Sequence, residues 1–154
     1  MYVIDASVHI ADAHPQEPQH GEARALLAQV AAEDLTVFLP ELVLAEIAAG
    51  ISRGTGQISL AERLTGALRR VPQFHFVPVD RTLGDLAAEI AAHSQIRGCD
   101  AVYVALAQQR DAVLITLDRQ QRERVPTYVV ARSPAEELAR RNSAGPGNLE
   151  ASWA

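Results

Sequence analysis

The segment Val113-Leu114-Ile115-Thr116-Leu117-Asp118 decides the fold of this chain. Its run of apolar and β-branched residues is typical of a short strand buried on both faces. The start of the chain, Tyr2-Val3-Ile4-Asp5, has the same form, an apolar run closed by an aspartate. In parallel sheets the functional crevice lies beyond the carboxyl ends of the strands. We therefore expect Asp5 and Asp118 at the same edge of one sheet.

Outward from these two segments, strand-like and helix-like runs alternate along the chain. The strand-like runs lie near residues 2–5, 35–39, 74–79, 113–117 and 126–130, and the helix-like runs near 7–13, 21–33, 41–52, 58–71, 81–94, 100–110 and 134–141. This alternation predicts an α/β domain in layers with a mostly parallel sheet. The 154 residues suit a single domain, which we place at 1–141, and residues 142–154 have the composition of a disordered tail.

The composition excludes several classes of protein. The net charge of −5 provides no global basic field, so nucleic-acid binding would need a local mechanism. All 14 basic residues are Arg, and without Lys a P-loop nucleotide site cannot be built. Cys99 is the single cysteine, which excludes an internal disulfide and favours a reducing compartment, the cytoplasm. We expect neither secretion nor membrane anchoring, because no secretion signal or bilayer-length apolar run is present.

Each of three aspartates also has an ordinary structural interpretation. An Asp after a strand often caps the next helix, and this applies to Asp5 and Asp118, although Ser7 is an alternative cap for the helix near 7–13. Asp100 begins a strongly apolar helix-like run, so it too could cap. Capping is compatible with metal binding, since the helix dipole keeps such a carboxylate ionised.

Glu46 is the most informative acid. On a helix, the residues three or four positions away are Leu42, Val43, Ala49 and Gly50, so its charge projects from an apolar or small-residue stripe. A carboxylate in such surroundings needs a partner, either an Arg or a cation shared with other acids. Converging carboxylates repel one another unless some are protonated or a cation intervenes. Hard oxygen ligands suit Mg²⁺ or Mn²⁺, and such a site suggests metal-assisted hydrolysis of phosphodiesters.

Four motifs together resemble the PIN-domain family, and more narrowly the VapC-type ribonuclease toxins of toxin–antitoxin pairs. The motifs are Val3-Ile4-Asp5-Ala6-Ser7, Pro40-Glu41-Leu42-Val43-Leu44-Ala45-Glu46-Ile47, Arg97-Gly98-Cys99-Asp100-Ala101-Val102-Tyr103-Val104-Ala105-Leu106-Ala107 and Leu114-Ile115-Thr116-Leu117-Asp118. Their order, their spacing and the length of the chain agree with the family over residues 1 to about 133.

The resemblance implies a three-layer α/β/α sandwich with a five-stranded parallel sheet, and an Mg²⁺ or Mn²⁺ site at Asp5, Glu46, Asp100 and Asp118. It implies that Asp5 and Asp100 bind metal directly, whereas Glu46 and Asp118 bind it directly or through water. Ser7 and Thr116 match hydroxyl positions that orient the acids or waters. The resemblance also implies a homodimer and an antitoxin that occupies the cleft.

Three arginines, Arg97, Arg119 and Arg122, are candidates for RNA contacts, with a solvated basic loop after Asp118 as the alternative. Five histidines and one cysteine show no zinc-like spacing. The leading hypothesis is a metal-dependent endoribonuclease that acts as the toxin of a toxin–antitoxin pair. Two alternatives are a non-catalytic module that binds a protein partner and a housekeeping nuclease of RNA processing or DNA.

Overall fold

A computed structural model describes residues 1–143 of the chain and shows a five-stranded parallel sheet of order β3-β2-β1-β4-β5. The strands are β1 (Tyr2–Ile4), β2 (Val37–Pro40), β3 (Phe74–Val77), β4 (Val113–Ile115) and β5 (Ala131–Arg132). β1 occupies the centre of the sheet, pairing with β2 on one side and β4 on the other. The chain proceeds from β1 outward to β2 and β3, then crosses back to β4. The carboxyl ends of β1 and β4 therefore flank the point where the winding direction reverses.

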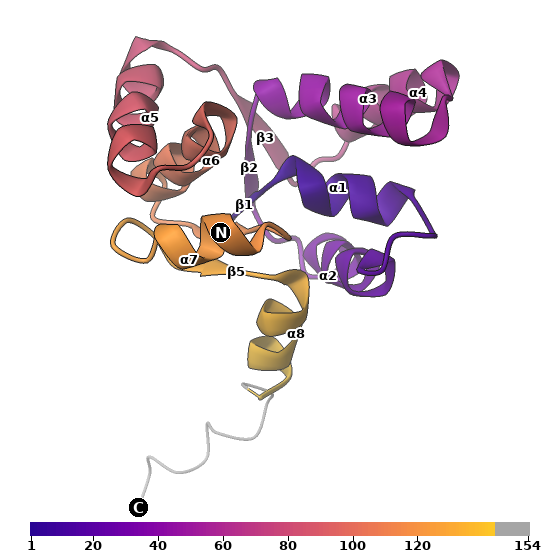
Figure 1. The fold of residues 1–154 in the computed structure, drawn as a ribbon. Helices are drawn as coiled ribbons and strands as arrows, with labels where there is room; N and C mark the ends of the chain where they lie inside the picture. The colour runs from indigo at the N-terminus through magenta and orange to yellow at the C-terminus, as the bar shows by residue number, and fades with distance from the viewer. Residues whose placement is uncertain (144–154) are drawn as a thin grey trace, which may run out of the picture.

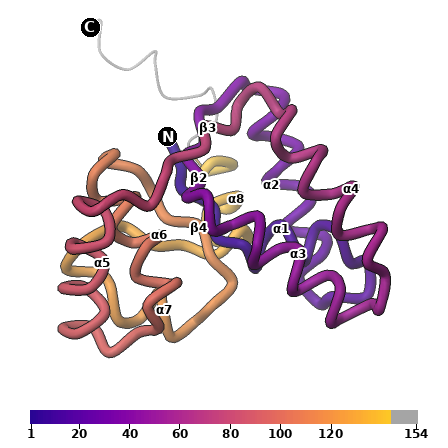
Figure 2. Tube along the Cα trace, turned by 90° about the horizontal axis from the view of Figure 1, so that it is seen from above, coloured from indigo at the N-terminus to yellow at the C-terminus, as the bar shows by residue number. Residues whose placement is uncertain are grey.

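Helices cover both faces of this sheet, as Figures 1 and 2 show. On one side lie α1 (Ala6–Ala13), α2 (His20–Ala32), α3 (Leu42–Thr55) and α4 (Ile58–Leu68). On the other side lie α5 (Arg81–Ser94), α6 (Gly98–Gln109) and α7 (Arg119–Arg124), and α8 (Pro134–Ser143) packs against α2. This arrangement is the predicted α/β/α sandwich. No helix among residues 1–143 is long and apolar enough to cross a bilayer.

The core sits between the central strands and α6. The side chains of Val3, Ile4, Leu114 and Ile115 are fully buried, which explains why β1 and β4 are continuous apolar runs. The run from Ala101 to Ala107 in α6 is buried on all sides, because this helix crosses β1, β2 and β4 and is covered by α5. This packing on all sides fixes the first turn of α6 at the edge of the sheet.

Three predicted boundaries differ from the structure. The last strand was expected near 126–130 but forms at Ala131–Arg132, because Pro126 has no N–H to donate and the amides of Tyr128 and Val129 bond back to Val125 in a turn. Residues 119–124, considered as a basic loop, form α7. Helix α8 runs to Ser143, so the first two residues of the expected tail are helical, and the rest of the tail lies outside the described residues.

Candidate functional site

Asp5 lies at the carboxyl end of β1, where it caps α1. Its carboxylate accepts a hydrogen bond from the backbone N–H of Ser7 at 3.3 Å, and also from the hydroxyls of Ser7 at 2.5 Å and Thr116 at 3.1 Å. The N-cap of α1 is therefore Asp5, and the alternative cap at Ser7 was wrong. Ser7 lies within the first turn of the helix and orients the carboxylate of Asp5 instead.

Ser7 and Thr116 connect the end of β1 to the end of β4. The hydroxyl of Ser7 accepts from the amide of Leu117 at 3.2 Å, and the hydroxyl of Thr116 accepts from the amide of Asp118 at 3.1 Å. Each hydroxyl thus donates to Asp5 and accepts from the β4–α7 loop. The two residues hold this loop and the central carboxylate in one fixed relationship.

Glu46 comes from α3 and approaches Asp5 across the sheet edge. Its Oε2 atom accepts a hydrogen bond from the hydroxyl of Tyr103 at 2.5 Å. Burial raises the pKa of the Asp5 carboxyl, and the negative charge of Glu46 raises that pKa further, whereas the hydrogen bonds from Ser7 and Thr116 lower it. The nearby charge of Glu46 thus contributes to a raised pKa at Asp5. Perturbed pKa values of this kind are characteristic of functional sites.

Asp100 lies in the first turn of α6 and is 7% exposed, so its charge is almost entirely removed from water. Both of its oxygens accept from the guanidinium of Arg97, at 2.8 Å from Nε and 3.0 Å from Nη2. The same Nη2 lies 3.5 Å from Oδ2 of Asp118, which caps α7 and is 32% exposed. Arg97 therefore joins Asp118 to the group of acids.

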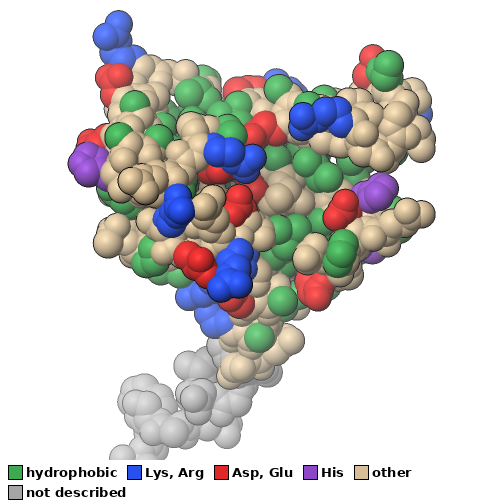
Figure 3. Space-filling model, in the orientation of Figure 1, with side chains coloured by type: hydrophobic (Ala, Val, Ile, Leu, Met, Phe, Trp, Pro, Cys, Tyr) green, Lys and Arg blue, Asp and Glu red, His purple; other side chains and the backbone are tan. Residues whose placement is uncertain are grey.

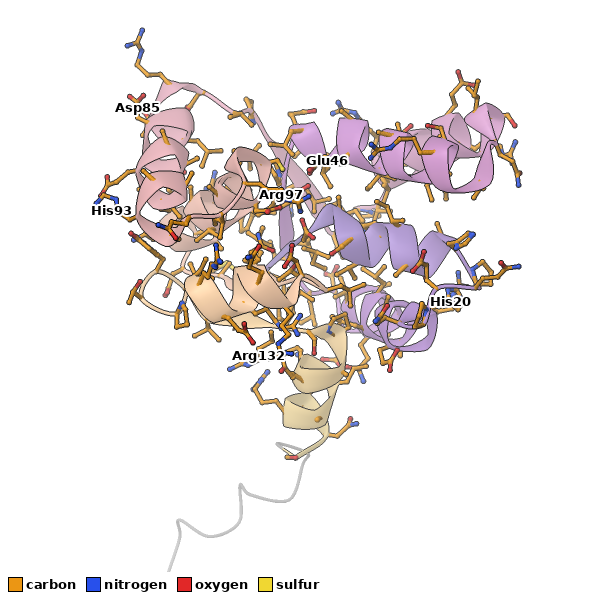
Figure 4. All side chains as sticks on the ribbon, in the orientation of Figure 1. His20, Glu46, Asp85, His93, Arg97 and Arg132 are labelled. Carbon is orange, nitrogen blue, oxygen red and sulfur yellow. The ribbon has the colours of Figure 1, made fainter. Side chains whose placement is uncertain are left out.

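Three of these acids line a pocket of about 380 Å³ between α1, α3 and the start of α6. Asp5, Glu46 and Asp100 line it together with Ser7, Arg53 and Arg97. Figure 4 shows Glu46 and Arg97 facing one another over this space, and acidic and basic side chains gather in the middle of the face seen in Figure 3. Three acids that are distant in the sequence thus line one pocket, and Arg97 joins Asp118 to them.

Comparison with known families assigns the chain. Residues 2–125 match the model of the PIN domain. The chain belongs to the PIN-domain family. No curated protein matches the sequence.

Solved structures with the same fold include toxins and toxin–antitoxin complexes. The PIN domain described here is similar to the Mycobacterium tuberculosis toxin VapC20, which cleaves the sarcin–ricin loop: TM-score 0.69, 20% identity, covering 80% of this chain and 94% of that chain. It is similar to FitAcB from Neisseria gonorrhoeae, with a TM-score of 0.67, 22% identity and coverage of 88% and 99%. It is also similar to VapBC2 from Rickettsia felis, solved with a promoter DNA fragment: TM-score 0.66, 14% identity, coverage 86% and 97%.

Nucleases of the PIN family generally use divalent metal ions, and the donor set of this pocket fits such an ion in its chemistry. The lining carboxylates of Asp5, Glu46 and Asp100 are the hard oxygen ligands that Mg²⁺ and Mn²⁺ take. In the placement seen here, however, no group of three or more acidic, His or Cys side chains among residues 1–143 is close enough to hold a metal. The oxygens are engaged by protein donors instead, most completely at Asp100.

The candidate RNA contacts occupy different environments in this PIN domain. Arg97 and Arg119 are 71% and 83% exposed, and Arg119 pairs with Glu123 within α7. Arg122 is largely buried, donates to the backbone oxygen of Thr116 at 2.9 Å and lies 3.7 Å from Glu136. Arg122 thus supports the loop that carries Asp118. Of the exposed arginines, Arg97 lines the pocket together with Arg53, and Arg119 lies outside its lining.

Sequence reasoning missed two polar contacts of the site. Tyr103, fully buried, holds Glu46, and its position one turn after Asp100 in an otherwise aliphatic helix was the available signal. Gln121, also buried, donates to the backbone oxygen of Asp100 at 3.1 Å and so joins α7 to α6. Cys99 directly precedes Asp100 and is partly buried. Burial raises the pKa of its thiol, and the charges of Asp100 and Glu46 raise it further, which disfavours the thiolate.

Proposed function

We propose that this PIN domain is an Mg²⁺- or Mn²⁺-dependent endoribonuclease and the toxin of a type II toxin–antitoxin pair. The observation that carries the proposal is the convergence of Asp5, Glu46 and Asp100 on one pocket, with Asp118 joined to them through Arg97. The pocket lies where the winding of the sheet reverses, which is the usual place for ligands in α/β folds.

Each side chain of the site has a distinct proposed role. Asp5 and Asp100 are the proposed direct ligands, and Glu46 and Asp118 act directly or through water. A bound divalent ion would supply an activated water and neutralise the charge that develops on the phosphodiester. Ser7 and Thr116 keep the carboxylate of Asp5 oriented. The exposed guanidinium of Arg119 is a proposed contact for the RNA backbone, since Arg binds phosphate oxygens in a bidentate manner.

The substrate and partners are inferred from the fold and its neighbours. An RNA substrate is supported by the structural similarity to VapC20, a toxin that cleaves the sarcin–ricin loop, and an antitoxin partner by the complexes of similar structure. We propose a cytoplasmic location, because an RNA substrate and a protein antitoxin would both be met there. A homodimer is proposed from the family resemblance, and the mass of the purified protein from light scattering would test it.

The test compares intact protein with the double variant Asp5→Asn/Asp100→Asn. Each change removes a negative charge while keeping the shape of the side chain, so the fold should persist. The variant should lose Mg²⁺-dependent RNA cleavage and the heat of Mn²⁺ binding in calorimetry. Asp85→Asn, an exposed aspartate on α5, is the matched control and should retain both. Full RNase activity in the double variant would overturn the assignment.

Two further measurements separate the alternatives. No heat from Mn²⁺ titration into the intact protein, across millimolar concentrations, would favour a non-catalytic module that binds a protein partner. Induced expression should arrest growth, and the product of an adjacent small gene should relieve the arrest. Activity on RNA without growth arrest would favour a housekeeping nuclease instead.

A further inference from the structure

Arg97 occupies an unusual position between two acids of the pocket. Its guanidinium forms a bidentate pair with Asp100 through Nε and Nη2, at 2.8 and 3.0 Å, and its Nη2 also reaches Asp118 at 3.5 Å. The side chain is nevertheless 71% exposed. Arg97 is therefore held by its ionic contacts with the acids more than by packing, and it can leave without disturbing the core.

Asp100 needs such a partner. It is 7% exposed, and an ionised carboxylate removed from water is strongly unfavourable unless it is paired. A bidentate Arg–carboxylate contact is the strongest pairing that a protein side chain offers. In the described part of the chain, this single guanidinium provides the cationic contact of Asp100.

The same contact competes with a metal at Asp100. Both carboxylate oxygens accept from Arg97, and the guanidinium occupies two of the about four lone-pair positions that a carboxylate offers to donors and cations. Correspondingly, residues 1–143 present no cluster of three ligating acids in this placement, although three carboxylates line one pocket. Metal binding and the Arg97–Asp100 pair thus compete for one carboxylate.

We propose that Arg97 is a tethered cation that neutralises the acidic pocket in the metal-free protein and must release Asp100 when the metal binds. The strength of the Arg97–Asp100 pair then sets the affinity of the site for the metal. This inference rests on the proposed metal-dependent nuclease and deepens it. Its consequence is that Arg97 lowers metal affinity, whereas an arginine that only steers RNA would leave it unchanged.

Arg53 provides a matched control within the same pocket. It lines the pocket and carries the same charge, but its Nε donates to the backbone oxygen of Ala49 at 3.2 Å, and it forms no ion pair among residues 1–143. Arg53→Gln and Arg97→Gln therefore change the net charge near the acids equally. Only Arg97→Gln removes a competitor for the carboxylate of Asp100.

The experiment is calorimetric titration of metal-stripped protein with Mn²⁺, in the intact chain, Arg97→Gln, Arg97→Lys and Arg53→Gln. Arg97→Gln should lower the Kd for Mn²⁺ about tenfold below that of Arg53→Gln, the scale of one charge-assisted contact. Arg97→Lys keeps the positive charge but cannot donate to both oxygens of Asp100 as the planar guanidinium does. Its Kd for Mn²⁺ should therefore lie between those of Arg97→Gln and Arg53→Gln. In EDTA, Arg97→Gln should also melt at a lower temperature than Arg53→Gln, because Asp100 is then left unpaired.

The outcomes are distinguishable. If Mn²⁺ binds all four proteins and Arg97→Gln binds no more tightly than Arg53→Gln, the tethered-cation role is wrong while the metal site stands. If Mn²⁺ binds none of them, the proposed metal site is wrong, and the proposed release of Asp100 by Arg97 on metal binding is wrong as well. Tighter binding by Arg97→Gln, with lower stability in EDTA, supports both.

Discussion

The hydroxyl of Tyr103 donates a hydrogen bond to Oε2 of Glu46 at 2.5 Å and so joins α6 to α3 across the candidate site. Tyr103 is fully buried, and Asp100 lies one turn earlier on the same helix. Burial raises the pKa of the Tyr103 hydroxyl, and the charges of Asp5 and Glu46 raise it further. The hydroxyl therefore stays protonated and remains a donor over the whole working range of pH. Through this contact, α6 positions acids on two different helices.

We predict that Tyr103→Phe impairs catalysis without unfolding the protein. The ring would keep its packing, but Glu46 would lose the donor that orients it. Loss of a group that orients a ligand typically costs about 10- to 100-fold in metal affinity or activity, so kcat for RNA cleavage should fall by about tenfold. Tyr128→Phe, on the turn after α7, is the control and should keep full activity. Wild-type kcat and Mn²⁺ affinity in Tyr103→Phe would show that this hydrogen bond does not matter.

Thr116→Val tests the link between β1 and β4. Val has nearly the shape of Thr, but it cannot donate to Asp5 or accept from the amide of Asp118, both at 3.1 Å in the structure. Because Thr116 is fully buried, water cannot replace these bonds, and stability should fall by about 1–3 kcal/mol. Urea unfolding measures the loss. Exposed Thr82 provides the control, and Thr82→Val should unfold within about 0.5 kcal/mol of the intact protein.

The elements that the sequence predicted best are those whose periodicity and burial agree. The runs that became β1, β4 and α6 are continuously apolar because they are buried on every side. The short helix α7, Arg-Gln-Gln-Arg-Glu-Arg, has no apolar stripe, so periodicity could not reveal it. Its cap was the only local signal, since Asp118 accepts from the amide of Gln121 three residues later.

The site was predictable as a set of acids but not as a set of contacts. Each acid could be found from its own surroundings, as Glu46 could from its stripe of small and apolar neighbours. The partner of each acid depends on tertiary packing. The helical spacing of Arg97 and Asp100 permits a pair, yet only the placement of α7 brings Asp118 to the same guanidinium. We expected either protonation of some acids or a cation among them, and in this structure the guanidinium of Arg97 lies between Asp100 and Asp118.

Glu137 is the centre of a second buried ionic network, away from the site. It is 0% exposed and accepts from the Tyr2 hydroxyl at 2.6 Å, from Arg132 at 2.8 Å and from Arg140 at 2.7 and 3.0 Å. These contacts tie α8 to β1 and β5. Burial alone would raise the pKa of Glu137, but the hydrogen bonds from Arg140, Tyr2 and Arg132 lower it to about 2.

We predict that Glu137→Gln destabilises the protein by about 1–3 kcal/mol at neutral pH, because charge-assisted bonds are replaced by weaker ones. The folded pKa lies below the ordinary value of 4.5, so the stabilisation is complete above pH 4.5 and is lost as the pH falls toward 2. Glu137→Gln should lack this part of the acid sensitivity. Exposed Glu62 gives the control, since Glu62→Gln should leave both the stability and its pH dependence unchanged. Equal acid sensitivity in Glu137→Gln would contradict the network's role.

His9 is buried on α1, with its ring edge-on to Phe74 at a centroid distance of 5.5 Å. Its Nε2 atom has no hydrogen-bond partner among the described residues. The ring faces an apolar pocket formed with residues of α2, α3 and α4, including Leu27, Ile47 and Leu64. Burial in these surroundings lowers the pKa of His9 to about 4.

The neutral imidazole of His9 should make stability depend on pH in a defined window. Between pH 6.5 and about 4, His9 is protonated in the unfolded chain but stays neutral in the folded protein. The stability of the folded protein therefore falls as the pH falls from 6.5 toward about 4. The loss attributable to His9 is at most about 3 kcal/mol. Urea unfolding at pH 7 and pH 5 should show a smaller difference for His9→Phe than for the intact protein, whereas His93→Phe, on the exposed end of α5, should keep the full difference. The acid that lines this pocket, Asp12, pairs with Arg24 at 3.2 Å. A protonated His9 at pH 5.5 in NMR spectra of the folded protein would contradict this account.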